Sequence, residues 1–191
     1  MSTITVVKKD GWAAIAADTL TTCGTGQETA KYIVNHSKII QVGESYLAVC
    51  GPASAQNALQ DYFSKHTHEM CFESVGALFS IWLGVHESLK EQYFLITGKD
   101  EEDSFESSEI DVLIVNSHGI FGIDRHRAAQ EYGSFYATGG GSRFATGAMY
   151  AVYEDKNRSA EEIARLGVEA AAEFHSATGL PVISYAVKLK K

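Results

Sequence analysis

The chain has 191 residues, of which 45% are apolar and only two are proline, so it is long enough to bury the core of one compact domain covering residues 1–191. Its formal charge of -8 argues against binding to nucleic acid or to anionic membranes, because both depend on clustered lysine and arginine. The three cysteines show no metal-ligand spacing, so free thiols are expected. There is no leader pattern and no apolar stretch of the ~20 residues that a bilayer requires. These features predict a cytoplasmic protein.

The first part of the chain predicts two hairpins followed by two helices. Apolar runs at 3–7 and 12–17 flank a polar turn, and the runs at 38–42 and 46–50 flank another. Helical spacing then begins at 53 and continues to about 66. A longer helix follows, with an apolar stripe wide enough to lie against a sheet: Phe72, Val75, Phe79, Trp82, His86, Leu89 and Tyr93. His86 is interpreted as a core or boundary residue rather than as a ligand.

The segment 98–109 is acidic and poor in large apolar residues, which is typical of a solvated loop. A calcium loop is the alternative interpretation, but the glycine and the terminal glutamate of such a loop are not at the required spacing.

The second part predicts more strands, then two helices and a last strand. The runs at 111–116 and 120–124 form a hairpin, a polar connector leads to a strand at 134–138, and a glycine run precedes a helix at 142–153. A helix at 159–175 opens with a capping box made by Ser159 and Glu162, and a strand at 182–189 closes the chain. This order predicts an α+β fold in which helices cover two packed sheets.

The beginning of the chain predicts an unusual nucleophile. If Met1 is removed, which a small second residue permits, Ser2 carries a hydroxyl group and a free α-amine on one residue. The ordinary pKa of an α-amine is ~7.7 to 8.0, so it can accept the hydroxyl proton near neutral pH without a histidine.

A nucleophile of this kind needs charged neighbours. A lysine keeps the pKa of the amine low and stabilises the reacting alkoxide, and a carboxylate holds the lysine in place. Asp18, at the end of the second strand, and Lys38, at the start of the third, are the candidates. Taken alone, Asp18 is also a good turn residue and Lys38 a good solvated strand end.

Three other interpretations stay open at this point. The glycine run 139–141 before a helix can hold an anion, although it lacks the lysine of a phosphate-binding loop. A metal site from His66, His68 and Cys71 lacks a fourth ligand. A structural or assembly protein without catalytic activity is the third.

Four blocks of the sequence carry a family resemblance: STITVVKKDGWAAIAADT, SKIIQVGESYLAVCGPASA, LIVNSHGIFGID and YATGGGSRFATGAM. In order and spacing they resemble the proteasome β-subunit and HslV peptidase family, and most of all its small bacterial proteasome homologues. The resemblance covers nearly the whole chain. It implies the N-terminal nucleophile hydrolase fold, a four-layer αββα sandwich, without a cofactor or metal.

The resemblance also implies roles for single residues. Ser2 matches the nucleophile, Asp18 and Lys38 the acid and the lysine, and Gly51 the glycine whose N–H forms the oxyanion hole. Thr22 matches a position whose backbone pairs with an extended substrate. The pocket for the side chain before the cleaved bond is expected near His36, Ile40, Val49 and Ala53.

At four positions the chain departs from the family pattern. The nucleophile is serine instead of threonine; serine lacks the methyl group that fixes the rotamer, so a slower site is expected. Gly140 stands where the family has a serine beside the amine. His175 stands at the family's aspartate, and Thr178 replaces a second serine.

The resemblance implies a self-compartmentalising peptidase: stacked homo-oligomeric rings of six or seven subunits that enclose the sites and act on unfolded polypeptide, with an ATPase unfoldase as a possible partner. The 72–93 helix and the helix from Ser142 are the candidates for ring contacts. The alternatives are a non-proteolytic or inactive ring protein, or an amidohydrolase of the same fold.

Overall fold

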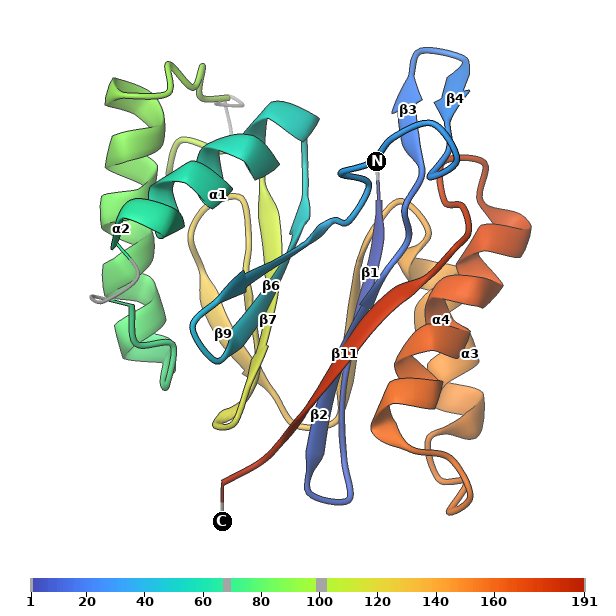
Figure 1. Cartoon of the computed structure of the whole chain (residues 1–191). Helices are drawn as coiled ribbons and strands as arrows, with labels where there is room; N and C mark the ends of the chain where they lie inside the picture. Colours follow the sequence, from blue (N-terminus) through green and yellow to red (C-terminus); the bar gives the residue numbers. More distant parts are fainter. Residues whose placement is uncertain (1, 67–69, 99–102, 191) are drawn as a thin grey trace.

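Two antiparallel sheets face each other in the structure, a computed structural model that describes residues 2–66, 70–98 and 103–190. The four-stranded sheet has the order β10-β1-β2-β11 and consists of β1 (Thr3–Lys9), β2 (Trp12–Ala17), β10 (Phe135–Gly139) and β11 (Ile183–Lys188). The five-stranded sheet has the order β5-β6-β7-β8-β9 and consists of β5 (Ile39–Val42), β6 (Ser45–Cys50), β7 (Asp111–Asn116), β8 (Gly119–Ile123) and β9 (Ala129–Tyr132). A small hairpin of β3 (Thr21–Cys23) and β4 (Gly26–Glu28) projects beside the N-terminal end of β1 (Figure 1).

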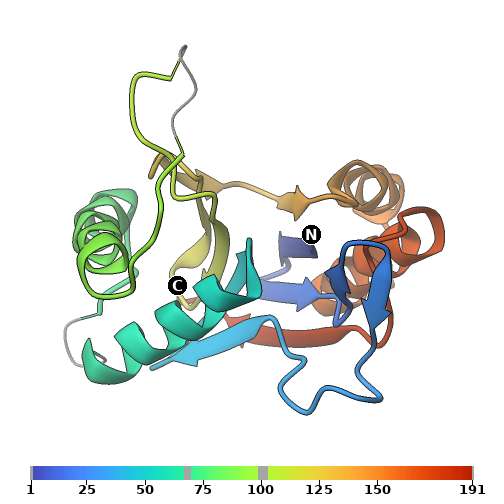
Figure 2. The same ribbon diagram turned by 90° about the horizontal axis from the view of Figure 1, so that it is seen from above.

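Helices cover the outer faces of both sheets. The pair α1 (Ala53–His66) and α2 (Val75–Glu91) lies on the five-stranded sheet, and the pair α3 (Ser142–Val152) and α4 (Ala160–Phe174) on the four-stranded one. The view from above shows the layers in the order helices, sheet, sheet, helices, and the N-terminus lies in the middle of the sandwich (Figure 2). The α+β fold with four αββα layers is therefore confirmed.

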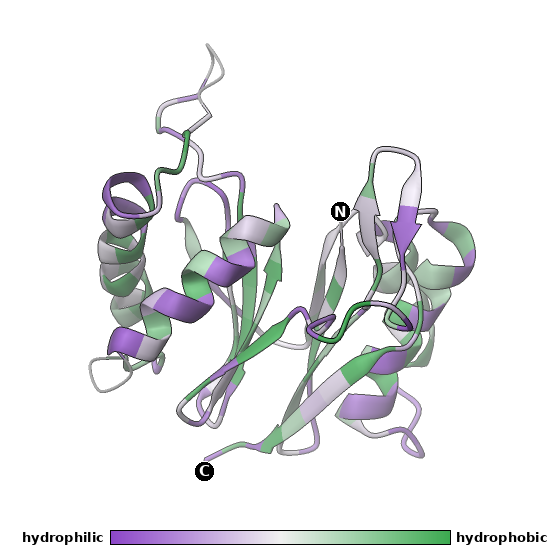
Figure 3. Cartoon of the chain, turned by 45° about the horizontal axis from the view of Figure 1, so that its top comes forward, coloured by the Kyte–Doolittle hydropathy of each residue, from purple (hydrophilic) through white to green (hydrophobic). Residues whose placement is uncertain are grey.

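Alternation along β1 assigns its side chains to two different apolar layers. Ile4 and Val6 point between the sheets, while Thr5 and Val7 point toward α4, where the Thr5 hydroxyl donates to the carbonyl of Ala164 at 2.8 Å. Successive residues of a strand face opposite sides, so this follows directly from the two-residue period. Figure 3 shows apolar residues along the strands and polar ones on the outward parts of the helices.

Most predicted elements are confirmed to within a few residues at their ends, including the capping box of Ser159 and Glu162. Three strands were not predicted: β3 and β4 are only three residues long, and β9 contains Gln130 and Glu131. Short polar strands give no periodic apolar signal, because their pairing depends on the neighbouring chain rather than on burial.

The predicted stripe on the long helix is wrong at Val75 and Phe79, which are 38% and 47% exposed. The buried positions of α2 are Leu78, Trp82, Val85, His86 and Leu89. The prediction joined two adjacent faces of the helix, because apolar residues occur on both. Leu83, also half-exposed, belongs with Val75 and Phe79 on the outer face.

His86 lies at the boundary of the core, as expected. Its Nε2 lies 2.9 Å from Glu106 Oε1, and Lys90 Nζ donates to the same oxygen at 2.7 Å. These two contacts hold the pKa of Glu106 down at about 2. Residues 99–102 of the segment expected to be a solvated loop lie outside the described part of the chain; on either side of them, Gly98 and Ser107 form a β-bridge.

Glu106→Gln is expected to remove a pH-dependent part of the stability. Because the folded-state pKa of Glu106 is lowered, its ion pairs stabilise the fold above pH 4.5 and are lost as the pH falls toward 2. Urea unfolding should therefore show wild type more stable than Glu106→Gln at pH 6, with the difference shrinking between pH 4.5 and 3. A difference that stays constant over this range would contradict the assignment.

Candidate active site

Ser2 lies at the end of the four-stranded sheet, directly before β1, and is only 5% exposed. It lines a cavity of about 440 Å³ between the sheet ends, the β3–β4 hairpin and the start of α1. The Ser2 carbonyl accepts a hydrogen bond from the N–H of Gly140 at 2.9 Å, which fixes the residue against the end of β10. Its position one residue before Thr3 places it on the same side as Ile4, toward the space between the sheets.

Asp18 and Lys38 form a buried ion pair beside this cavity, as the sequence predicted they could. Asp18 is fully buried, and its Oδ1 accepts from Lys38 Nζ at 2.8 Å and from the N–H of Thr3 at 2.9 Å. Its Oδ2 accepts from the N–H groups of Leu20 and Gly179. Four donors thus surround one carboxylate, so neither residue acts as the turn residue or the solvated strand end of the simpler interpretation.

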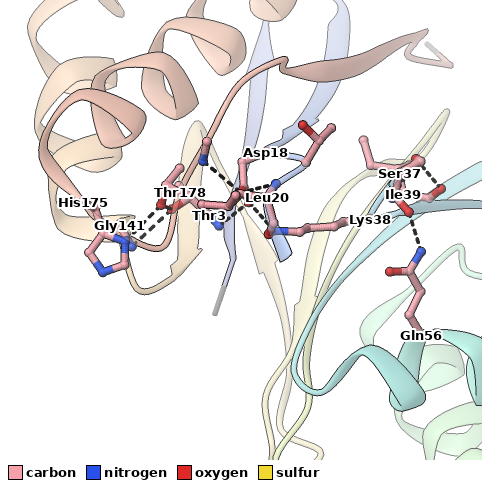
Figure 4. A network of polar contacts seen from close by, with 12 residues as sticks. Thr3, Asp18, Leu20, Ser37, Lys38, Ile39, Gln56, Gly141, His175 and Thr178 are labelled. Atoms are coloured by element: carbon pink, nitrogen blue, oxygen red, sulfur yellow. Dashed lines mark hydrogen bonds and ion pairs between the residues drawn. The ribbon is translucent and has the colours of Figure 1, made fainter. Parts of the chain in front are cut away.

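Lys38 reaches the site from the other sheet, at the residue before β5. Besides Asp18 it donates to the carbonyl of Leu20 at 2.7 Å, and its side chain is 9% exposed (Figure 4). Two of the three ammonium hydrogens are thus used within the fold. Lys38 and Ser2 both line the cavity.

The hydroxyl of Thr3 belongs to a separate chain of polar contacts on the other side of β1. Thr3 Oγ1 lies 2.7 Å from Thr178 Oγ1 and accepts from the N–H of Gly141, and Thr178 Oγ1 lies 3.0 Å from His175 Nδ1 (Figure 4). Thr3 is fully buried. The structure therefore brings His175 and Thr178 to Thr3, one residue away from Ser2.

Five further predicted site residues line the same cavity as Ser2: Thr22, His36, Val49, Gly51 and Ala53. Ile40 does not. It is 7% exposed and packs in the core beneath α1 and α2. The reason is its place along β5: Ile40 pairs with Leu47 on the face that the helices cover, two residues further from the cavity than Val49 on the same face.

Several residues at the site were not predicted from the sequence. Gln56, Asn57 and Gln60 lie one and two helical turns after Ala53 and line the cavity, as does Glu28 on β4. Helical spacing from Ala53 could have found the first three, since positions three, four and seven apart share a face. Cys50, adjacent to Gly51, is half-buried near Ser2, and burial raises the pKa of its thiol.

Residues of the metal interpretation are used otherwise or lie outside the described chain. His66 Nδ1 bonds the carbonyl of Tyr62 at 2.8 Å, Cys71 is exposed, and His68 is not described. Within 2–66, 70–98 and 103–190, no three His, Cys, Asp or Glu side chains come together as metal ligands. No helix in these ranges is both long enough and apolar enough to span a bilayer.

The structure has two facing sheets between two pairs of helices, and a hydroxyl residue precedes the first strand beside a buried lysine and aspartate. This is the proteasome-type fold of the N-terminal nucleophile hydrolases. The structure superimposes on BPH of Thiobacillus denitrificans in complex with epoxomicin with a TM-score of 0.91 and 48% sequence identity, over 99% of this chain and 100% of that chain. Another structure of that protein superimposes with a TM-score of 0.92 and 49% sequence identity, over 98% of each chain. HslV from Trypanosoma brucei shares the fold at a TM-score of 0.73 and 15% identity, over 97% of this chain and 99% of that one.

The chain therefore belongs to the BPH family of bacterial proteasome homologues. No family model and no curated protein sequence matches it.

Lys38→Met is expected to destabilise the fold by about 3 kcal/mol or more, because it leaves the fully buried Asp18 carboxylate without its cation. Lys65→Met is the matched control: Lys65 pairs with Asp61 on the exposed face of α1, where water solvates both charges, and its loss should cost far less. Denaturant unfolding at neutral pH measures both. Equal costs for the two variants would show that the buried pair contributes no more than a surface pair.

Gly139→Ala should displace Ser2 and lower the free energy of unfolding by more than about 2 kcal/mol. Gly139 has φ +93, and a Cβ at this position would lie 1.9 Å from the Ser2 carbonyl oxygen, so the backbone must shift. Gly133→Ala, where a Cβ meets nothing within 4 Å, serves as the control. A Gly139→Ala variant as stable as Gly133→Ala in thermal unfolding would refute this account of the terminus.

Proposed function

We propose that the chain is a peptidase subunit that hydrolyses peptide bonds with Ser2 as its nucleophile, after removal of Met1. The observation that carries this proposal is the buried Lys38–Asp18 pair in the wall of the cavity that Ser2 also lines. Desolvation of an ammonium group costs free energy, so a lysine is rarely buried without a structural or functional role. The epoxomicin complex of the 48% identical relative agrees with a proteasome-like chemistry.

In the proposed reaction the Ser2 hydroxyl attacks the carbonyl carbon of the scissile bond, and the α-amine of the same residue takes the hydroxyl proton. The tetrahedral intermediate collapses when that proton passes to the departing amine. An ester on Ser2 remains, and water, deprotonated by the same α-amine, hydrolyses it and restores the hydroxyl group.

Lys38 contributes charge and not proton transfer in this scheme. Its ammonium group disfavours protonation of the nearby α-amine and stabilises the alkoxide, while Asp18 keeps the ammonium in position. The N–H of Gly51, at the end of β6 in the cavity wall, is the proposed donor to the oxyanion. Thr22 on β3 offers backbone groups to an extended substrate, because within the described chain β3 pairs only with β4.

His175, Thr178 and Gly140 are proposed to support the terminus without touching the substrate. The Gly140 N–H holds the Ser2 carbonyl, and the contacts from His175 through Thr178 fix Thr3. Both sets of contacts restrict the chain on either side of the nucleophile. This support replaces the serine and aspartate side chains that the family pattern has at positions 140 and 175.

Assembly into stacked homo-oligomeric rings of six or seven subunits completes the proposal, with unfolded polypeptide as substrate and an ATPase unfoldase as a possible partner. Enclosure would keep folded proteins from the site. The outer face of α2 exposes Val75, Phe79 and Leu83, and α3 exposes Phe144 and Tyr150, so both helices have apolar surface for subunit contacts. A native mass near that of one chain would contradict the assembly.

Ser2→Ala should abolish covalent labelling by a peptide epoxyketone, a reagent that needs both the hydroxyl group and the α-amine. Ser2→Thr should restore labelling, and Ser64→Ala, at an exposed position of α1, should leave it unchanged. Intact mass shows in one measurement whether Met1 is absent and whether the adduct has formed. Labelling that survives in Ser2→Ala, or a wild-type chain that always retains Met1, would end the nucleophile proposal.

A second candidate is a ring protein without proteolytic activity, or an amidohydrolase of another substrate. The observation in its favour is that the chain of contacts from His175 ends at Thr3 and that Gly140 supplies no hydroxyl. A correctly processed wild type that takes up no epoxyketone and cleaves no unfolded polypeptide would favour the inactive ring protein. Labelling without peptide cleavage would favour the amidohydrolase.

A further inference from the structure

One wall of the cavity beside Ser2 is polar, and the start of α1 is the reason. Ala53, Gln56, Asn57 and Gln60 share the helix face toward the cavity, while the other face of α1 packs in the core. Asn35 and His36 come from the loop before β5, and Glu28 comes from β4. Four apolar side chains line the cavity as well: Leu20, Ile33, Ile39 and Val49.

Two side-chain nitrogens of this wall are used within the protein. Gln56 Nε2 donates to the carbonyl of Ser37 (Figure 4), and His36 Nδ1 bonds the carbonyl of Ile33 at 2.8 Å. A carbonyl only accepts, so Nδ1 carries the hydrogen. Lys38, the one cation among the described lining residues, is neutralised by Asp18.

The same wall offers hydrogen-bond acceptors and a negative charge to a ligand. A neutral His36 ring protonated at Nδ1 has a lone pair on Nε2, and the Gln56 carboxamide retains its oxygen. Glu28 adds a carboxylate that forms no ion pair within the described chain, so the lining as a whole carries a negative charge. An anionic side chain would be repelled by the Glu28 carboxylate, and no unpaired cation among the described lining residues could bind it.

We propose that this cavity binds a lysine or arginine side chain of the substrate, on the residue before the cleaved bond. The methylene groups of such a side chain can pack against the apolar lining residues, and its cationic end donates to Glu28, Gln56 and His36. This inference rests on the proposed function, because it takes Ser2 as the point of cleavage. It adds the substrate class that the site selects.

Three tripeptide epoxyketones that differ only in the residue next to the reactive group test the inference. That residue is lysine, norleucine, which is lysine without the ammonium group, or glutamate. Labelling of the Met1-processed protein is followed by intact mass to give second-order rates. We expect the lysine probe to react about tenfold faster than the norleucine probe, and the glutamate probe to be the slowest.

Variants at position 28 assign the preference to Glu28. Glu28→Gln should lower the ratio of the lysine to the norleucine rate about threefold, and Glu28→Lys should bring it below one. Glu44→Gln, an exposed carboxylate in the β5–β6 turn, is the matched control and should leave the ratio unchanged. A ratio that is the same in Glu28→Gln as in wild type would overturn the role of Glu28.

The results separate this inference from the proposed function. A norleucine probe that labels Ser2 as fast as the lysine probe, or faster, overturns the inferred preference and leaves the nucleophile in place. A protein that reacts with none of the three probes overturns the proposed function, and the inference with it.

Discussion

The ion pair of Lys38 and Asp18 is the constraint on which the site depends. The two residues come from different sheets: Asp18 follows β2 of the four-stranded sheet, and Lys38 precedes β5 of the five-stranded sheet. Burying both charges is favourable only when their other hydrogen-bonding groups are also satisfied. The N–H groups of Thr3, Leu20 and Gly179 and the carbonyl of Leu20 do this, so the segments around the pair are held by the same contacts.

The pair therefore joins the ends of the sandwich at the point where the cavity opens. The sheets can separate there only by breaking this ion pair and letting water reach both groups. The site is consequently formed only when the two sheets pack against each other. A chain whose sheets have not docked has no positioned ammonium group and hence lacks the site of the proposed reaction.

The sequence predicted the architecture well because most strands and helices carry a strong periodic signal. The alanine-rich β2 and the capping box of α4 are examples, since each depends on local spacing alone. The pair of Asp18 and Lys38 was found from chemistry, because a terminal nucleophile requires those two residue types. The family resemblance then supplied Thr22, His36, Val49, Gly51 and Ala53, all of which line the cavity.

The missed features are those that depend on tertiary neighbours. Ile40 and Val75 are apolar residues in regular elements, and only the packing decides which face is covered. His175 and Thr178 were expected at the site from the family resemblance, but their contact with Thr3 was not, because a connection across more than 170 positions is contained in no local pattern. The polar face of α1 gives no signal of its own, because glutamine and asparagine are common on helix surfaces that face only water.

The alternation of β1 has a consequence for maturation. Ser2 and Thr3 both carry hydroxyl groups, yet they lie on opposite sides of the strand, and the Thr3 hydroxyl is enclosed beside Thr178. An aminopeptidase that trimmed one residue too many would still leave a hydroxyl amino acid at the terminus. That terminus would nevertheless be inert, so the proposed activity tolerates no error in the length of the processed end.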